Sequence, residues 1–159
     1  MARQRLLSVG KQFPEFRLPL LAGGEATLAD IAAGGPVLLA FFKVSCPVCQ
    51  LTLPFLERLH ASDALAIYGV SQNGAEDTRE FNRSFRINFP VLLDQEEADF
   101  PLSNACGIST VPTLVLVEPG GKVTSVQEGF VRREMEALGA RAGASPFRPG
   151  DYVPEWQSG

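Results

Sequence analysis

The chain has only three cysteines, one histidine and one tryptophan in 159 residues. Three cysteines are too few for a scaffold held together by several disulfides, and one histidine leaves few ligands for a metal site. A formal net charge of −4, with no block of lysines and arginines, argues against nucleic acid as a partner. No apolar run approaches the length of a membrane span. The chemistry of this chain must therefore be sought in a few reactive residues.

Length and composition predict one globular domain, because 45% of the residues are hydrophobic and 20% are charged. The N-terminal stretch 1–13 is basic, but its apolar part is shorter than the core of a signal peptide. We therefore expect a cytoplasmic protein as the sequence is written. A periplasmic or other extracytoplasmic location is the alternative if a leader has been removed. We also expect a monomer with no nucleic-acid or membrane partner.

Two of the cysteines, Cys46 and Cys49, enclose a proline and a valine. The apolar run 37–42 before them predicts a buried strand, and 47–60 has the apolar periodicity of a helix. Cys46 then lies at the helix N-terminus, where free amides and the helix dipole favour a thiolate, the reactive form of cysteine. Pro47 suits the first helical position. Cys49 lies one turn on, within reach of a mixed disulfide on Cys46, so the pattern predicts a redox-active dithiol.

A pair of cysteines at this spacing is also typical of half of a structural zinc site. Such a site needs four ligands, and only Cys106 and His60 remain to complete it. We therefore favour the dithiol and expect neither a metal nor another cofactor. Cys106 is expected to be a buried structural thiol, with a regulatory redox thiol as the alternative. His60 lies too far along the predicted helix to serve Cys46.

Apolar runs alternate with amphipathic segments along the rest of the chain. Strands are expected at 65–71, 90–93, 112–117 and 123–127, after a short edge strand within 13–21. Helices are expected at 76–86, 96–105 and 130–142, after a helical turn at 27–31. Strands separated by helices and ending in a hairpin predict an α/β fold with a central mixed β-sheet and helices on both faces.

Four motifs in this order resemble the thioredoxin superfamily: VLLAFFKVSCPVCQLTLP, VSQN, NFPVLLD and TVPTLVLVEPGGKV. The resemblance is to its TlpA/ResA-like and AhpC/TSA-like proteins and spans roughly residues 9–139. It implies a thioredoxin-like fold with an N-terminal extension, and a thiol-disulfide oxidoreductase. The partners implied are protein or small-molecule thiols and disulfides, together with a redox partner.

The resemblance also implies roles for individual residues. Cys46 would be the exposed nucleophile and Cys49 the resolving thiol. Pro112 would be a cis-proline facing the dithiol, although an X-Pro bond is more often trans. Val111 would offer backbone hydrogen bonds to a substrate peptide, as in β-augmentation, and Pro47 would lie at the same substrate-binding surface.

Three residues depart from the pattern of these families. Ser45 replaces the tryptophan that usually precedes the first cysteine, Ala40 replaces a buried aspartate, and Thr52 replaces a glutamate of the active-site helix. Both usual proton acceptors are therefore absent. Water, the Cys46 sulfur or a group from elsewhere would have to accept the proton of Cys49.

Two other functions are alternatives. Peroxidases of the AhpC/TSA type use a Pro-x-x-x-Thr/Ser-x-x-Cys motif. Counting back from Cys46 gives Lys43 and Leu39, and from Cys49 gives Cys46 and Phe42, so neither cysteine fits. A metal-binding or copper-delivery module is the less favoured alternative, because the only histidine lies within the adjoining helix.

We assign residues 1–144 to the thioredoxin-like domain and 145–159 to a C-terminal tail. Three prolines make regular structure unexpected in the tail. Its aromatic residues, Phe147, Tyr152 and Trp156, predict that it packs on something. Docking along the domain surface is the simpler interpretation, and covering the site or recruiting a partner is the other.

Overall fold

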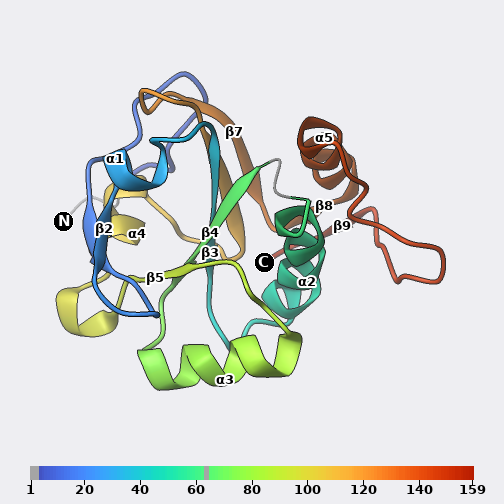
Figure 1. The fold of residues 1–159 in the computed structure, drawn as a ribbon, viewed down its shortest axis with the longest axis horizontal. Helices are drawn as coiled ribbons and strands as arrows, with labels where there is room; N and C mark the ends of the chain where they lie inside the picture. The colour runs from blue at the N-terminus through green and yellow to red at the C-terminus, as the bar shows by residue number, and fades with distance from the viewer. Residues whose placement is uncertain (1–3, 63–64) are drawn as a thin grey trace.

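A computed structural model describes residues 4–62 and 65–159, so residues 1–3 of the basic N-terminal stretch lie outside the described residues. A five-stranded sheet forms the centre, in the order β5-β4-β3-β6-β7 (Figure 1). Neighbouring strands are parallel from β5 to β3 and antiparallel from β3 to β7. The strands are β3 (Val37–Phe42), β4 (Ala66–Ser71), β5 (Val91–Leu93), β6 (Thr113–Val117) and β7 (Val123–Glu128). The prediction of a mixed central sheet is confirmed.

Strand β3 lies at the middle of this sheet, and all six of its residues are buried. A continuous apolar run is what a strand covered on both faces requires. Helices α2 (Pro47–His60), α3 (Ala75–Phe85) and α5 (Arg132–Ala142) contribute to the core on one face. Helices α1 (Leu28–Ile31) and α4 (Pro101–Cys106) contribute to the core on the other. The expected helices on both faces are therefore confirmed.

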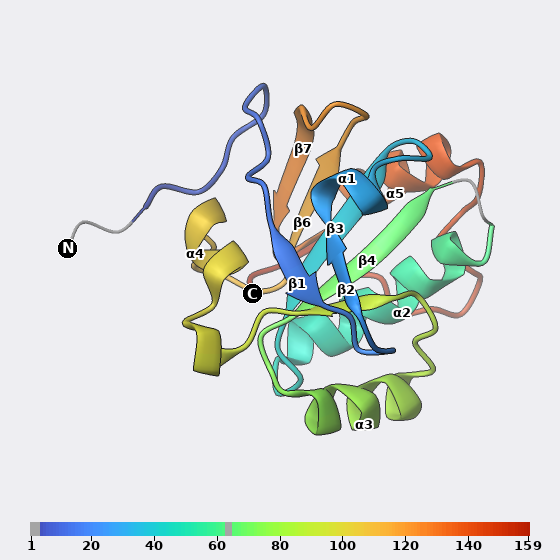
Figure 2. The same ribbon diagram turned by 60° about the vertical axis from the view of Figure 1, so that its left-hand side comes forward.

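An N-terminal extension precedes the first core strand. Its strands β1 (Arg17–Pro19) and β2 (Glu25–Thr27) form a small antiparallel sheet. They cover the face of the main sheet opposite α2, with α1 beside them (Figure 2). Helix α1 begins with a capping box, in which the Thr27 side chain and the Asp30 carboxylate each accept from the other residue's amide. None of the helices within residues 4–62 and 65–159 is both long and apolar enough to cross a membrane.

Two predicted elements differ in the structure. The expected helix 96–105 is wrong as a single element, since a 3-10 turn (Glu96–Ala98) and α4 are separated by Asp99 and Phe100. Both have positive φ, and the proline that follows Phe100 disfavours a helical conformation there. The short strand expected within 13–21 is confirmed as β1. The start of the expected helix 130–142 is strand β8 (Phe130–Val131).

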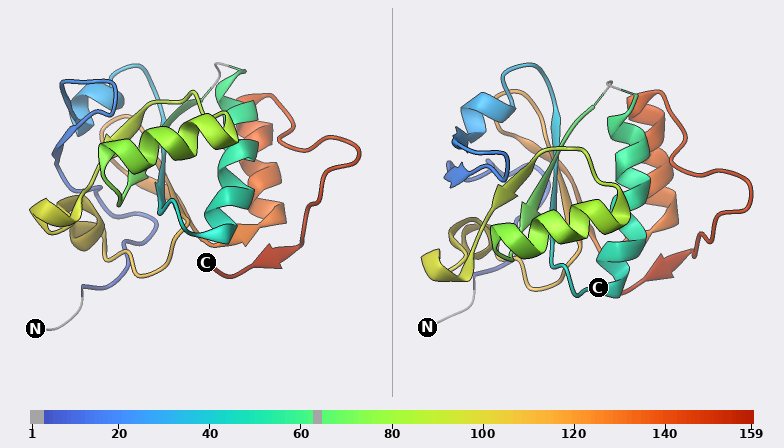
Figure 3. Two further views of the ribbon diagram at one scale, coloured as in Figure 1. Left: turned by 90° about the horizontal axis from the view of Figure 1, so that it is seen from below. Right: turned by 60° about the horizontal axis from the view of Figure 1, so that its bottom comes forward.

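The tail packs along the domain and is not wholly irregular. Strand β9 (Trp156–Gln157) pairs antiparallel with β8, so the expectation of no regular structure is wrong there. Figure 3 shows the tail leaving α5 and returning beside α2. The Phe147 ring packs on Phe55 with 5.0 Å between ring centroids, whereas Tyr152 and Trp156 are 70% and 61% exposed. Of the three aromatic residues, only Phe147 packs as predicted. The domain boundary at 144 stays a prediction.

A charged pair joins the tail to α2. The Arg58 guanidinium donates to both carboxylate oxygens of Asp151, at 2.6 and 3.1 Å, and to the Pro146 carbonyl at 2.9 Å. Arg58 also lies 5.2 Å from the centroid of the Phe55 ring. Paired charges with a bidentate geometry fix orientation better than a single hydrogen bond does. This pair therefore sets where the tail crosses α2.

Replacing Leu56 with alanine tests the packing of α2 on the sheet. Leu56 is fully buried, and its truncation leaves a cavity under the helix. The free energy of unfolding should fall by about 2–5 kcal/mol in denaturant titrations. The control is Val9→Ala, because Val9 is 61% exposed and its truncation should change stability by less than about 0.5 kcal/mol. Equal effects of both changes would contradict the packing described.

The Arg58–Asp151 pair should make stability depend on pH at the acid end. Hydrogen bonds from the Arg58 side chain, and then from the Arg148 amide, lower the pKa of Asp151 from 3.8 to about 2. A carboxylate with a lowered pKa stabilises the folded state above its unfolded value and loses that contribution as the pH falls through the folded one. The difference in unfolding midpoint between the protein and Asp151→Asn should be constant above pH 4 and shrink toward pH 2.

The matched control for this pH effect is Glu136→Gln, which removes an exposed partner of Arg132. Exposed pairs of this kind contribute little to stability. A midpoint difference for Asp151→Asn that does not change between pH 4 and pH 2 would show that the pair does not hold the folded tail.

Candidate active site

Cys46 ends the loop that follows β3 and begins α2. Its backbone is extended, with φ −85° and ψ 115°, and its amide donates to the Lys43 carbonyl at 3.3 Å. The amide of Cys49 donates to the Cys46 sulfur at 3.1 Å. The sulfur thus takes the place of the capping oxygen at a helix start, where free amides and the helix dipole favour negative charge. Pro47 occupies the first helical turn and is exposed.

The segment before β6 meets Cys46 because β6 is the antiparallel neighbour of β3. The Cys46 thiol donates to the Val111 carbonyl with 3.4 Å between sulfur and oxygen. The Val111–Pro112 bond is cis, and Pro112 is buried. The structure therefore brings together all five residues of the expected site, since Pro47 and Cys49 belong to the same helical turn as Cys46.

The two thiols differ in exposure. Cys46 is half-buried, whereas Cys49, on the inward face of α2, is fully buried. Neither forms a disulfide in this structure. Burial, and next the hydrogen bond with the Cys46 sulfur, raise the pKa of Cys49 far above its usual range. Cys49 is therefore a protonated thiol while Cys46 is reduced. The accessible sulfur is that of Cys46.

In the part of the chain that the structure describes, no buried carboxylate near the dithiol takes the place of the two missing acids. Ala40 and Thr52 are both buried, and the Thr52 hydroxyl donates to the Val48 carbonyl at 2.7 Å within α2. Among residues 4–62 and 65–159, the one buried acidic side chain is Asp94. Its two oxygens accept from the Leu102 and Ser103 amides of α4, on the other face of the sheet. The polar groups beside the Cys49 thiol are the Cys46 sulfur and the Lys43 backbone.

Two side chains that the sequence analysis did not single out hold the loop before Cys46. The Asn73 side-chain oxygen accepts from the Val44 amide at 2.9 Å. The Gln50 side chain donates to the Val44 carbonyl at 3.0 Å. Asn73 belongs to the VSQN motif, which marked the family but carried no role. Only the meeting of the loops after β3 and β4 reveals it.

The remaining cysteine and the histidine lie away from the dithiol. Cys106 is fully buried in the core on the other face, and burial followed by the Asp94 charge raises its pKa to about 12. His60 ends α2, roughly 20 Å along the helix from Cys46, and its ring packs against Phe89. The four candidate zinc ligands are therefore not together. The described part of the chain contains no group of three or more His, Cys, Asp or Glu side chains that could hold a metal ion.

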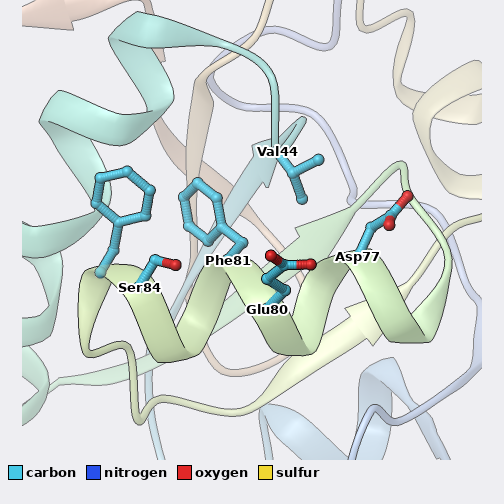
Figure 4. Close-up of a pocket in the computed structure, with 6 residues that line it drawn as sticks. Val44, Asp77, Glu80, Phe81 and Ser84 are labelled. Carbon is cyan, nitrogen blue, oxygen red and sulfur yellow. The ribbon is translucent and has the colours of Figure 1, made fainter.

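Two shallow hollows flank the loop that carries Cys46. One of about 230 Å³ is polar, with Lys43, Gln72 and Ser109 beside Val111. The other, of about 220 Å³, lies between Val44 and the α3 side chains that include Asp77, Glu80 and Phe81 (Figure 4). The hollow beside Val111 therefore contains the cation Lys43, and the hollow beside Val44 contains the acids Asp77 and Glu80.

Known proteins share both the sequence pattern and this fold. The AhpC/TSA family model matches residues 9–126. The thioredoxin-like protein YneN of Bacillus subtilis (strain 168) is 30% identical over 136 residues, covering 80% of this chain and 76% of that protein. The thiol-disulfide oxidoreductase ResA of Geobacillus thermodenitrificans (strain NG80-2) is 27% identical over 132 residues, covering 80% and 74%.

A solved structure matches as well. The thioredoxin domain of a thiol-disulfide oxidoreductase from Bacteroides vulgatus superposes with a TM-score of 0.70 at 25% identity, covering 78% of this chain and 91% of that one. The expected thioredoxin-like fold is confirmed by this likeness and by the mixed sheet with helices on both faces. The chain belongs to the AhpC/TSA family, on its thioredoxin-like, ResA-related side.

Proposed function

We propose that Cys46 and Cys49 are the redox-active dithiol through which this chain acts as a thiol-disulfide oxidoreductase. The observation that carries the proposal is the position of the Cys46 sulfur. It caps α2, accepts from the Cys49 amide at 3.1 Å and faces the Val111 carbonyl. Relatives named thiol-disulfide oxidoreductase support the activity.

The reaction proceeds through a mixed disulfide. The Cys46 thiolate attacks one sulfur of a substrate disulfide, forms a bond to it, and releases the other sulfur as a thiolate. Cys49, as a thiolate, then attacks the Cys46 sulfur and releases the second substrate thiolate. Two electrons have passed to the substrate, and the protein holds a Cys46–Cys49 disulfide. A dithiol partner restores the reduced form, and the reverse sequence oxidises a substrate dithiol.

The electrostatics of the pair order these two attacks. Burial and the neighbouring Cys46 sulfur raise the pKa of Cys49, so Cys49 stays protonated before the substrate arrives. Once Cys46 is in a mixed disulfide, its sulfur no longer carries negative charge, and that part of the effect disappears. A hydrogen bond with the Lys43 backbone, and then the Lys43 charge, lower the pKa of Cys49. The resolving thiol is thus activated after the first attack.

Val111 and Pro47 form the substrate-binding surface of this proposal. The Val111 carbonyl faces Cys46, so a substrate backbone that pairs with Val111 would bring its own sulfur to the nucleophile. Pro47 is exposed beside it. Protein thiols and disulfides, small thiols and disulfides, and a redox partner are the partners proposed. The monomeric state and the cytoplasmic location stay predictions, and the names of the relatives do not support the location.

Single cysteine variants test the two roles. Cys46→Ser should abolish reduction of a disulfide substrate such as insulin, because no attacking sulfur remains. Cys49→Ser should accumulate a mixed disulfide visible as added mass, because the second attack is lost. The control is Cys106→Ala, which alters a buried thiol on the other face and should keep the activity. Full activity of Cys46→Ser would contradict the assignment.

Alkylation tests the difference in exposure. In the reduced native protein at pH 8, iodoacetamide should modify Cys46 first, because Cys49 and Cys106 are fully buried and burial raises the pKa of both thiols. Mass spectrometry of peptides should find those two cysteines modified only after unfolding. Modification of Cys106 as fast as Cys46 in the native protein would contradict the burial described.

A further inference from the structure

Residues 156–159 of the tail lie close to Val111, the residue proposed to bind the substrate backbone. It crosses α2 through Asp151, and the Glu155 carbonyl then accepts from the Arg132 amide at 3.0 Å. Strand β9 continues along β8, with Trp156 opposite Val131 and Gln157 opposite Phe130. Both panels of Figure 3 place the end of this segment beside the first turn of α2, the turn that Cys46 begins.

The last described residues lie against the backbone around Pro112. At Gly159, an added Cβ would overlap the Val111 carbonyl oxygen and would lie 2.6 Å from a Thr110 methyl carbon. At Gly129, whose amide donates to the Pro112 carbonyl at 2.8 Å, an added Cβ would overlap the Gln157 carbonyl oxygen. Such close approach between backbones is possible only because both positions are glycine. The tail therefore lies directly on the backbone segment that contains Val111 and precedes β6, which we call the Val111 edge.

Because Gly159 already packs on the Val111 backbone, a second backbone cannot bind in the same place. An extended peptide pairing with Val111 would need the space that Gly159 fills. The polar hollow with Lys43, Gln72 and Ser109 lies beside the same Val111 and is lined by no residue of the tail. A small disulfide needs no paired backbone, so we expect it to reach the half-buried Cys46 sulfur while the tail stays in place.

We propose that residues 156–159 form a specificity-determining cover over the Val111 edge. The cover competes with extended peptides for this edge and leaves small disulfides free to react. Protein substrates are then used only in the fraction of molecules whose cover has moved away. The inference rests on the proposed function, because it concerns which substrates reach Cys46.

The strongest support for a cover, as distinct from a fixed part of the fold, is its composition and exposure. Trp156 is 61% exposed although it is large and apolar, and Gly159 presents no side chain to the core. The cover pairs with β8 through two residues only. Just before it, Glu155 forms an exposed ion pair with Arg132. Exposed pairs and short strands contribute little free energy, so this segment can leave without unfolding the domain.

The first experiment compares the protein with a variant shortened to end at Glu155. We expect kcat/KM for a disulfide-bonded protein such as insulin to rise about tenfold, because the competent fraction increases. Turnover of a small disulfide such as oxidised glutathione should change less than about twofold, since it needs no uncovered edge. Equal changes for both substrates, or no change for insulin, would overturn the inference. Circular dichroism and the unfolding midpoint verify that the variant is folded.

A point variant avoids removing residues. In Gly129→Ala the new Cβ would displace Gln157, so insulin reduction should rise relative to oxidised glutathione. The matched control is Gly143→Ala, because both glycines have φ of 70° but a Cβ at 143 meets nothing within 4 Å. Any backbone strain is then shared by the two variants. A ratio of activities that shifts equally in both would contradict the cover.

Trp156 gives a direct signal of displacement, because it is the only tryptophan of the chain. In the Cys49→Ser variant, the Cys46 thiolate attacks a supplied disulfide, keeps one half as a mixed disulfide and releases the other half as a thiolate. When the disulfide is that of a peptide of about ten residues with one cysteine, the trapped peptide should change the Trp156 fluorescence. Cystamine, which leaves cysteamine on Cys46 in the same way, should not. If the peptide is trapped, as added mass shows, and the fluorescence stays constant, the cover is wrong. If no mixed disulfide forms with either thiol, the proposed role of Cys46 is wrong instead.

Discussion

Strand β3 is buried on both faces, and the rest of the structure depends on that constraint. Because six consecutive apolar residues must be covered on two sides, the chain needs helices and strands on each side of the sheet. The burial of β3 also determines where the chain leaves the sheet, because the strand ends with its apolar run at Phe42. Cys46 is the fourth residue after Phe42 and starts the helix that covers one face of the sheet. A rigid sheet thus holds the Cys46 sulfur beyond the carboxyl end of its central strand, with the Cys49 amide of the helix already directed at it.

The chemistry of the pair follows from placing two identical side chains in different surroundings. Cys46 keeps partial access to solvent and receives the Cys49 amide, whereas Cys49 lies in the core, where the charged form of a thiol is unfavourable. Related families place a carboxylate near the second thiol, and this chain has Ala40 and Thr52 there. In the reaction proposed above, the protonation of Cys49 depends instead on the Cys46 sulfur and on Lys43, and the charge of Cys46 changes as the reaction proceeds. In the proposed mechanism, the two half-reactions are therefore coupled through two neighbouring cysteines, whose contact includes the hydrogen bond from the Cys49 amide to the Cys46 sulfur.

The tail links the substrate edge to the outer surface of the active-site helix. Asp151 binds Arg58 on α2, and residues 156–159 reach Val111 through pairing with β8. A segment attached in this way is ordered without belonging to the core. The tail lies beside Val111, where we propose that substrate binds. It therefore controls access to Cys46 and not the reactivity of the Cys46 sulfur.

The sequence by itself determined the α/β class, most strands and helices, and the dithiol, because these depend on local periodicity and on residue identity. The helix 96–105 was mispredicted because two residues with positive φ, Asp99 and Phe100, interrupt an otherwise helical pattern. Other features could not be predicted because they arise between segments distant in the chain. Asn73 supports the loop before Cys46, and Gly159 meets Val111, 48 positions away. Local pattern specifies which residues can react, while tertiary packing decides which of them meet and what lies over them.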